Sequence, residues 1–238
     1  MGHPRERGDP VSFPKQNGDR GVALLNRGLA EAEIEYHDHT SDTVHVRFPV
    51  LSSKGGKLDG ASVVIWTTTP WTLPGNVAVV AHPDVDYVTI ERDNNGTKEK
   101  LILAKALLQK VFGEEELKVV DTFKGKKLNG LKYHPLYTFM PVDKPAYMVV
   151  MGDYVTTEDG TGLVHTAPAF GQEDMETGKK YDLPVLMTVL PDGTFMSEVT
   201  PWRGVFVKDA DPQIVTFMRS SLKPFQALPF IEAGGDQF

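Results

Sequence analysis

Short apolar runs separated by turn signals recur along most of this chain, and they constrain its fold more than any other feature. Val44, Val46 and Phe48 alternate with polar residues, which is the period of a strand with one buried face. Residues 61–66 form an almost continuous apolar run rich in β-branched side chains. The 22 glycines and 17 prolines favour many short turns over long helices. The sequence therefore predicts a fold in which strands dominate.

The same patterns predict individual elements. The strongest helix candidate covers residues 100–112, where Leu101, Ala104 and Leu108 recur at helical spacing, and residues 93–96 form a turn signal after a strand. Expected strands cover residues 43–48, 61–66, 76–81, 87–90, 117–123, 146–151 and 184–189, and expected helices cover residues 23–32, 100–112, 174–181 and 211–221. Because these elements do not alternate as β-α-β, the expected fold class is α+β, strand-dominated and barrel-like, with a few short helices.

The two ends of the chain differ from its middle. Met1 to Arg20 holds glycine, proline and charged residues with little periodicity. We therefore expect residues 1–30 to be a poorly ordered arm or a segment derived from cloning, with a short helix at its end. Residues 31–224 are expected to form the folded domain, and residues 225–238 a tail.

The composition excludes several classes of protein. With no cysteine, the chain has no disulfide framework, no thiolate zinc site and no thiol nucleophile. No apolar run approaches the ~20 residues that cross a bilayer, and no signal peptide is visible, so a cytoplasmic location is expected. The net charge of −7 argues against a stand-alone nucleic-acid binder.

Four threonines cluster immediately after the apolar run, where residues 66–72 read W-T-T-T-P-W-T. Hydroxyls at a strand end suit recognition of a small polar group, or of a water molecule, beside an apolar wall. The four hydroxyls are equally compatible with an ordinary strand end and turn. Trp66 and Trp71 are compatible with ordinary packing of aromatic side chains. The four hydroxyls belong to Thr67, Thr68, Thr69 and Thr72.

A second motif, G-T-G-L-V-H-T-A-P-A-F-G over residues 160–171, places three glycines and small residues around His165. Glycines let a bulky ligand approach the backbone closely. His165 can hydrogen-bond a substrate hydroxyl or an attacking water, or it can be a half-buried histidine satisfied by the backbone. Asp174 can hold an ammonium group at a pocket mouth, or it can simply cap or flank a helix.

Other catalytic and metal patterns carry little weight. His37-Asp38-His39 resembles a pair of metal ligands, but adjacent side chains on a strand point to opposite faces, so no metal site is expected there. The chain has no G-x-x-x-x-G-K-[ST] loop, no G-x-G-x-x-G opening a helix and no G-x-S-x-G elbow.

Taken together, the two motifs resemble the editing domain inserted into isoleucyl-tRNA synthetase. The resemblance rests on W-T-T-T-P-W-T-L-P-G-N from Trp66 and G-T-G-L-V-H-T-A-P-A-F-G-Q-E-D from Gly160, and it extends roughly over residues 30–223. The sister domains for valine and leucine resemble T-T-R-P-[ED]-T, with arginine where this chain has Thr69 and an acid where it has Trp71. This difference selects the isoleucine type.

The resemblance implies hydrolysis of valine misattached to the tRNA for isoleucine, with hydrolysis before transfer to tRNA left open. Thr67 to Thr69 would position water or the terminal ribose, His165 would lie near the ribose or the amino-acid backbone, and Asp174 would hold the α-ammonium group. The implied partners are the valine-carrying 3′ end of tRNA and the remainder of the synthetase, with no membrane, no metal and no cofactor. The substrate-binding residues would be Trp66, Trp71, Thr72, Gly162, Val164, Thr166, Ala167 and Phe170.

Two departures from the family pattern bear on this hypothesis. The chain lacks H-I-G-H and K-M-S-K-S motifs, so no aminoacylation site is expected in it, and Phe170 stands where the family often has histidine. A non-catalytic module that binds aminoacyl-adenosine or RNA, and an unrelated hydrolase of small esters, are the alternatives. The hypothesis requires the threonine-rich strand end to face His165 and Asp174 across one cleft.

Overall fold

The computed structural model describes residues 43–52, 56, 58–94 and 96–221. The strands are β1 (Val44–Ser52), β2 (Ala61–Thr67), β3 (Ala78–Ala81), β4 (Asp86–Asn94), β5 (Thr97–Ala104), β6 (Lys118–Lys124), β7 (Lys132–Tyr133), β8 (Met148–Met151) and β9 (Leu163–Thr166). The α-helices are α1 (Leu108–Phe112), α2 (Gln172–Lys180) and α3 (Val207–Ser221), and the 3₁₀ turns are η2 (Pro70–Gly75), η3 (Lys105–Leu107), η4 (Gly125–Leu128) and η5 (Thr200–Trp202).

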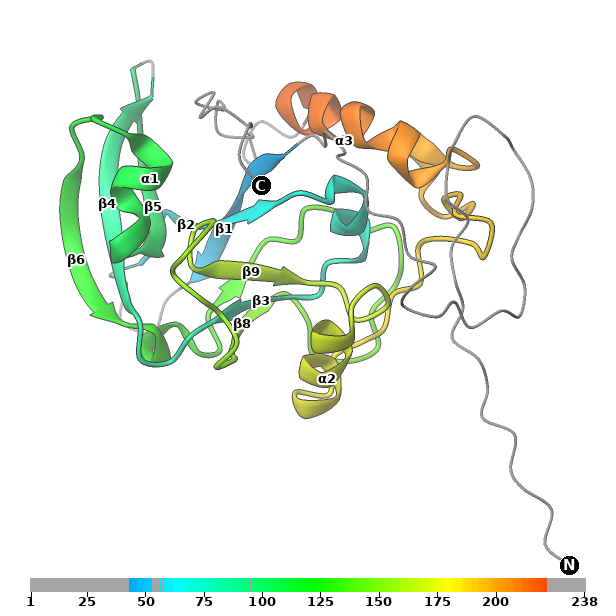
Figure 1. Ribbon diagram of the computed structural model, residues 1–238, viewed down its shortest axis with the longest axis horizontal. Coiled ribbons are helices and arrows are strands. Elements are labelled where there is room, and N and C mark those ends of the chain that lie inside the picture. Colours follow the sequence, from blue (N-terminus) through cyan, green and yellow to red (C-terminus); the bar gives the residue numbers. More distant parts are fainter. Residues whose placement is uncertain (1–42, 53–55, 57, 95, 222–238) are drawn as a thin grey trace, which may run out of the picture.

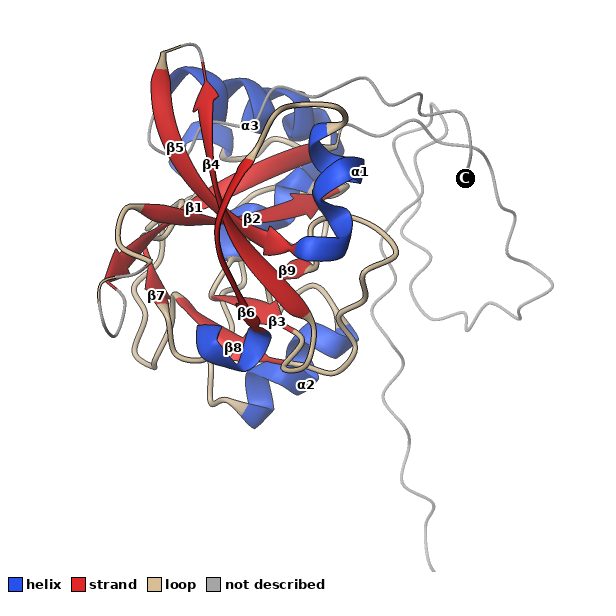
Figure 2. Ribbon diagram, turned by 90° about the vertical axis from the view of Figure 1, so that its left-hand side faces the viewer, coloured by secondary structure: helices blue, strands red, loops and turns tan. Residues whose placement is uncertain are grey.

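The described strands form one sheet of nine in the order β6-β4-β5-β2-β1-β7-β8-β3-β9 (Figure 1). β1 links the two halves, because it pairs antiparallel with β2 on one side and with β7 on the other. Most neighbours are antiparallel, while β2–β5 and β3–β8 are parallel. Figure 2 shows α1, α2 and α3 at separate places around the strands. The expected strand-dominated α+β fold is confirmed, although the sheet stays open and does not close into a barrel.

Several expectations fall on residues outside the described part. They are the arm at residues 1–30 with its short helix, the His37-Asp38-His39 pair and the tail at residues 225–238. The turn expected at residues 93–96 is confirmed, because Asp93 Oδ1 accepts a hydrogen bond from the Gly96 backbone N–H at 2.6 Å in the β4–β5 hairpin.

The helix expected over residues 100–112 is wrong in its first half. Residues 97–104 form β5, which pairs with β4 on one side and β2 on the other. Leu101 and Leu103 pack into the apolar cluster under α1, while Ile102 and Ala104 pack into the main core on the opposite face. The second half of β5, residues 101–104, is buried on both faces and apolar throughout, so it lacks the alternation that identifies a half-exposed strand.

The strand expected over residues 184–189 is also wrong. Only Val189 makes a bridge there, an isolated one to Phe195. Leu186 is buried whereas Val185 and Met187 are exposed, so burial alternates as in a strand although no ladder forms.

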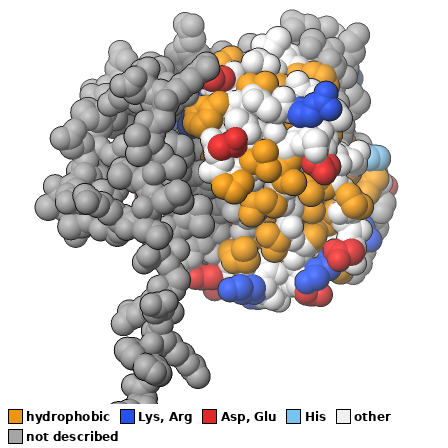
Figure 3. Space-filling view, turned by 90° about the vertical axis from the view of Figure 1, so that its right-hand side faces the viewer, with side chains coloured by type: hydrophobic (Ala, Val, Ile, Leu, Met, Phe, Trp, Pro, Cys, Tyr) orange, Lys and Arg blue, Asp and Glu red, His pale blue; other side chains and the backbone are white. Residues whose placement is uncertain are grey.

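Apolar side chains also gather on the face of the molecule shown in Figure 3.

Three consecutive elements place the first motif beside the second. β2 ends at Thr67, η2 turns the chain, and β3 returns antiparallel to β9 with Val79 opposite His165. β9 also contacts β2, so the last strand of the sheet curls back against the strand that carries the threonines. Strand pairing thus brings together two segments that are far apart in sequence.

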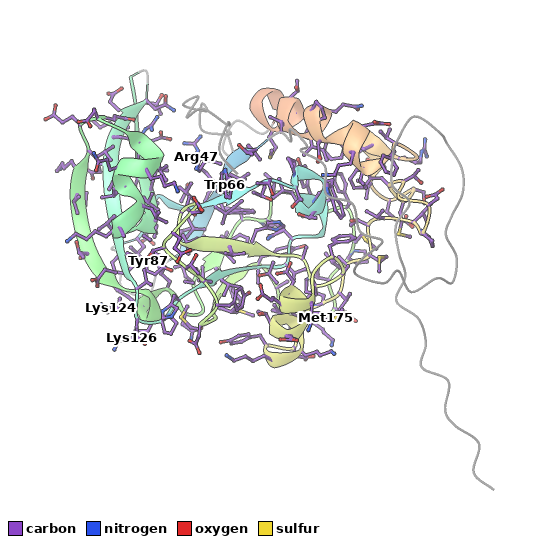
Figure 4. All side chains as sticks on the ribbon, viewed as in Figure 1. Arg47, Trp66, Tyr87, Lys124, Lys126 and Met175 are labelled. Carbon is purple, nitrogen blue, oxygen red and sulfur yellow. The ribbon has the colours of Figure 1, made fainter. Side chains whose placement is uncertain are left out.

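Tyr87 connects this region to the outer half of the sheet (Figure 4). From β4, its fully buried hydroxyl donates a hydrogen bond to the Gly162 carbonyl at 2.5 Å and accepts one from the His82 backbone N–H at 3.0 Å. Burial raises the pKa of Tyr87 to about 12, so the hydroxyl keeps its proton and remains a donor at neutral pH. Tyr87 therefore fixes the glycine-rich loop at the start of β9.

We predict that Tyr87→Phe lowers the free energy of unfolding by about 1–3 kcal/mol, because it leaves a buried carbonyl and a partly buried N–H without their partner. Urea unfolding measures the change. Tyr137→Phe is the matched control, since the buried Tyr137 hydroxyl has no hydrogen-bond partner in the described structure and its removal is expected to be nearly neutral. Equal losses in the two variants would contradict the role given to the Tyr87 hydroxyl.

Candidate active site

A cavity of about 410 Å³ opens where the end of β2, the turn η2, the strand β9 and the start of α2 meet. The threonines Thr67, Thr68, Thr69 and Thr72 line it together with His165 and Asp174. The structure thus brings the two sequence motifs to one cavity. Its lining residues are Trp66, Thr67, Thr68, Thr69, Thr72, Tyr154, Val155, Thr156, Asp159, Gly160, Thr161, Gly162, Leu163, Val164, His165, Phe170, Glu173 and Asp174.

The threonine turn is held by its own hydrogen bonds. The Thr69 backbone N–H donates to Thr67 Oγ1 at 3.1 Å, and the two hydroxyl oxygens lie 3.3 Å apart. Pro70 opens η2, where its fixed φ suits the first turn and its missing N–H costs nothing. Thr72 Oγ1 donates back to the Thr69 carbonyl at 2.9 Å. Three of the four hydroxyls are therefore fixed in place, while the Thr68 side chain is exposed.

The hydrogen bonds of Thr72 define the tautomer of His165. Thr72 Oγ1 lies 2.9 Å from His165 Nε2 and has one proton, which it donates to the Thr69 carbonyl. The hydroxyl must then accept from the imidazole, so the proton of neutral His165 is on Nε2. Nδ1 keeps its lone pair, and it is buried without a hydrogen-bond partner among the described residues.

Burial lowers the pKa of His165 to about 4, so the imidazole is neutral at neutral pH. A neutral ring accepts a hydrogen bond at Nδ1 and donates one at Nε2, but it holds no spare proton to release as an acid. The geometry therefore favours a positioning and hydrogen-bonding role over general-acid catalysis by an imidazolium.

Asp174 lies in the first turn of α2, half-buried at the cavity. Its Oδ2 accepts a hydrogen bond from the Ala167 backbone N–H at 2.9 Å, which ties the helix to the segment after β9. Burial raises the pKa of Asp174, the Ala167 hydrogen bond opposes that rise, and the neighbouring Glu173 adds to it. The carboxylate has no salt-bridge partner in the described structure, so an ammonium group in the cavity would meet an uncompensated negative charge.

The glycines of the second motif have a packing role as well. Gly162 has a φ of +71°, and a Cβ there would lie 2.4 Å from Ala104 Cβ on β5. Thr161 accepts a hydrogen bond from the Ala104 backbone N–H at 2.8 Å, so the loop lies directly on the end of β5. A Cβ at Gly160 would lie 3.3 Å from the ring of Trp66, which lines the cavity (Figure 4).

The other expected binding residues separate into two groups. Gly162, Val164 and Phe170 line the cavity, as do Trp66 and Thr72. The remaining three, Thr166, Ala167 and Trp71, are not part of the lining. Trp71 packs edge-to-face on Phe170, with 5.1 Å between ring centroids. The contribution of all these residues to substrate binding stays a prediction.

Sequence reasoning missed one wall of the cavity. Tyr154, Val155, Thr156 and Asp159 line it from the loop that precedes the glycine motif. Their residue types carry no recognisable pattern, and the only available signal was that they directly precede Gly160 in the sequence. The Tyr154 hydroxyl lies 3.1 Å from Thr177 Oγ1 on α2, which connects this loop to the helix that carries Asp174.

The described residues contain no group of three or more His, Cys, Asp or Glu side chains arranged to hold a metal ion. Within the same residues, no helix combines the length and apolar character that crossing a bilayer needs.

Comparison with known proteins gives related results from sequence and structure. Residues 40–211 match a family model described as leucyl-tRNA synthetase, editing domain. The chain is 49% identical over 201 residues to an isoleucine–tRNA ligase of Clostridium novyi (strain NT), and 47% identical over 203 residues to one of Pyrococcus furiosus. These matches cover 84% and 80% of this chain but 18% of each ligase.

Solved structures show the same fold at low sequence identity. GlLeuRS-CP1 superimposes with a TM-score of 0.62 at 14% identity, over 79% of this chain and 99% of that one. The cytosolic leucyl-tRNA synthetase editing domain of P. knowlesi superimposes with a TM-score of 0.55 at 12% identity, over 78% and 95% of the two chains. At such identities the likeness concerns the fold alone.

The lowered pKa of His165 predicts a dependence of stability on pH. Between pH 6.5 and about 4 the unfolded chain binds a proton at this histidine and the folded chain does not, so stability falls as pH falls through this window. Since one pKa unit corresponds to about 1.4 kcal/mol, the loss is about 3 kcal/mol at most.

Urea unfolding across this pH range measures the effect, and His165→Gln is expected to flatten it. Part of the slope will remain, because burial also lowers the pKa of His45. His134→Gln, at an exposed position, is the control and should leave the wild-type slope in place. A slope that survives in His165→Gln at full size would show that His165 is not buried in its neutral form.

Proposed function

The chain belongs to the family of aminoacyl-tRNA synthetase editing domains, and on this premise we propose that it hydrolyses valine misattached to the tRNA for isoleucine. The observation that carries the proposal is the meeting of the threonine turn, neutral His165 and Asp174 around one cavity of about 410 Å³. The choice of amino acid and tRNA is supported by relatives named isoleucine–tRNA ligase at 43–49% identity.

The physical need for such a site follows from the size of a methylene group. One methylene in an apolar pocket is worth only about 10–200-fold in discrimination, a range whose established example is valine against isoleucine in this class of synthetase. A second pocket that accepts valine and is too small for isoleucine removes the product that the first pocket wrongly made. The wall of that pocket must therefore resist displacement by a single methylene.

The first step in the proposed mechanism is capture of the amino acid through its charge. The α-ammonium group would bind Asp174, whose position is fixed by the Ala167 backbone N–H. In a half-buried site this charge-assisted hydrogen bond is strengthened by partial exclusion of water. Binding the ammonium group also relieves the cost of burying the carboxylate, which is the cause of its raised pKa.

The second step is the positioning of the ester and the attacking water. The hydroxyls of Thr67 and Thr69 are held 3.3 Å apart by the turn, so they present fixed donors and acceptors to water or to the terminal ribose. His165 holds Thr72 and thereby the turn, and its Nδ1 is an unused acceptor. Aminoacyl esters are already activated, so orientation and fixed hydrogen bonds suffice without a covalent intermediate. Hydrolysis before transfer to tRNA remains part of the proposal for the same pocket.

The whole reaction cycle needs more than this chain. The chain spans 18% of the length of the ligases named above, and we propose that the remainder of such a ligase holds the tRNA and delivers its 3′ end to the cavity. The expected location is the cytoplasm, where translation takes place in the bacteria and archaea that contain these relatives. Aminoacylation is assigned to the parts outside this chain.

The test is deacylation of valyl-tRNA and isoleucyl-tRNA, both made on the tRNA for isoleucine, by the 238-residue chain in excess over tRNA. Release of valine with sparing of isoleucine supports the proposal. Binding of a non-hydrolysable valyl-adenosine without release of either amino acid would instead indicate a non-catalytic module. Equal hydrolysis of valine esters that carry no nucleotide would indicate a hydrolase of small esters.

We predict that Asp174→Ala lowers kcat/KM for valyl-tRNA by about 30-fold or more, the size expected when one partner of a buried charge pair is removed. Rates under single-turnover conditions measure it, and circular dichroism checks the fold. Glu176→Ala, on an exposed position of the same helix, is the matched control and should retain the wild-type rate. Unchanged release by Asp174→Ala would remove the ammonium-binding role.

We also predict that Thr69→Arg weakens binding of a non-hydrolysable valyl-adenosine, because a long cationic side chain would enter the cavity and replace one hydroxyl of the turn. Isothermal titration calorimetry measures the affinity. Thr69→Ser keeps the hydroxyl and serves as the control. Undisturbed binding to Thr69→Arg would count against the threonine turn as a wall of the substrate site.

A further inference from the structure

A buried carboxylate on α3 contacts the backbone of the threonine turn from outside the cavity. Asp211 Oδ1 accepts a hydrogen bond from the Trp71 backbone N–H at 2.7 Å, across 140 residues of sequence. The Asp211 side chain is buried, and its Oδ2 lies 3.6 Å from Lys208 Nζ on the same helix. α3 packs along η2, as Figure 1 shows, and Asp211 is absent from the cavity lining. Asp211 therefore acts on the turn without touching the cavity.

The local geometry explains why the turn needs this acceptor. Thr69, the residue before η2, makes no side-chain cap, and Pro70 has no N–H. The Thr72 N–H is already bonded to the Thr69 carbonyl. The Trp71 N–H at the start of η2 has Asp211 Oδ1 as its acceptor, at 2.7 Å.

Trp71 is connected to the cavity through the ring of Phe170. The indole of Trp71 packs edge-to-face on Phe170, with centroids 5.1 Å apart and planes at 70°. Phe170 also lies close to Gly75, where a Cβ would be 2.9 Å from Phe170 Cε2. Phe170 itself lines the cavity near Asp174. The position of this wall therefore depends on where η2 holds Trp71.

We propose that Asp211 is a positioning residue that sets the size of the amino-acid pocket by fixing Trp71, and through it Phe170. The inference rests on the proposed function, since it assigns a determinant of the choice between valine and isoleucine. Loss of the Asp211 acceptor frees the start of η2, and the wall gains room for one more methylene. The ratio of valine to isoleucine release then falls, by about 10-fold on the scale that one methylene allows.

The experiment compares three variants on valyl-tRNA and isoleucyl-tRNA under single-turnover conditions. Asp211→Ala removes the acceptor and is expected to lower the ratio. Asp211→Asn keeps an oxygen that accepts the Trp71 N–H, so the ratio is expected to be rescued. Asp209→Ala removes an exposed acid from the first turn of the same helix and is the matched control.

A purely structural role for Asp211 gives a different result. In that case Asp211→Ala would lower both rates together and leave the ratio of valine to isoleucine release at its wild-type value, which would overturn the proposal. A lowered ratio in Asp209→Ala as well would also overturn it, because the effect would then belong to the helix and not to the contact with Trp71.

A spectroscopic measurement separates this inference from the proposed function. The chain has three tryptophans, so 5-fluorotryptophan labelling gives three fluorine resonances, and Trp71→Phe assigns the one of interest. Asp211→Ala is expected to shift the Trp71 resonance, whereas Asp209→Ala is not. If the wild-type chain releases neither amino acid, the proposed function fails, and the resonance alone decides whether Asp211 positions Trp71. An unshifted resonance then overturns the contact.

Discussion

The antiparallel pairing of β3 with β9 is the constraint on which the candidate site depends. Thr72 and His165 are separated by 93 residues, yet their side chains lie 2.9 Å apart because η2 leads directly into β3 and β3 pairs with β9. Backbone hydrogen bonds in a ladder fix register to a single residue, and a slip of one residue would turn His165 to the other face of the sheet. The register of the β3–β9 pairing therefore decides whether these side chains can meet at all.

Burial gives the two titratable groups of the cavity different properties. The same removal from water keeps His165 neutral and makes the negative charge of Asp174 costly. A neutral imidazole can hold the threonine turn over a wide pH range, because it does not change charge near neutrality. A half-buried carboxylate with one backbone donor is a strong acceptor for a cation. The cavity therefore has a hydrogen-bonded wall, formed by His165 and the threonine turn, and a separate charged group, Asp174.

The two motifs that meet at the cavity were easier to recognise in the sequence than the strands and helices that carry them. The threonine cluster and the glycine-rich motif are local and unusual, so they could be recognised without knowing how the strands pair. The strand at residues 97–104 could not, because its second half is buried on both faces and has the composition of a buried helix. Leu101 and Ala104 also lie at helical spacing from Leu108. The strand expected at residues 184–189 was wrong for the opposite reason. Burial alternates along this segment as in a strand, but the segment pairs with no neighbouring strand beyond the single bridge at Val189. Contacts such as Trp71 with Asp211 depend on packing between distant segments, which no local pattern encodes.

The contact of Gly162 with Ala104 has a consequence for how this domain tolerates sequence change. Since a Cβ at Gly162 would lie 2.4 Å from the Ala104 methyl group, each position limits the volume allowed at the other. Ala104 ends β5, outside both motifs, but a larger residue there would push the loop that leads into β9. The positions that shape the site therefore include one on a strand that contributes no side chain to the cavity, and a bulkier residue at Ala104 would press on the same loop that a side chain at Gly162 would displace.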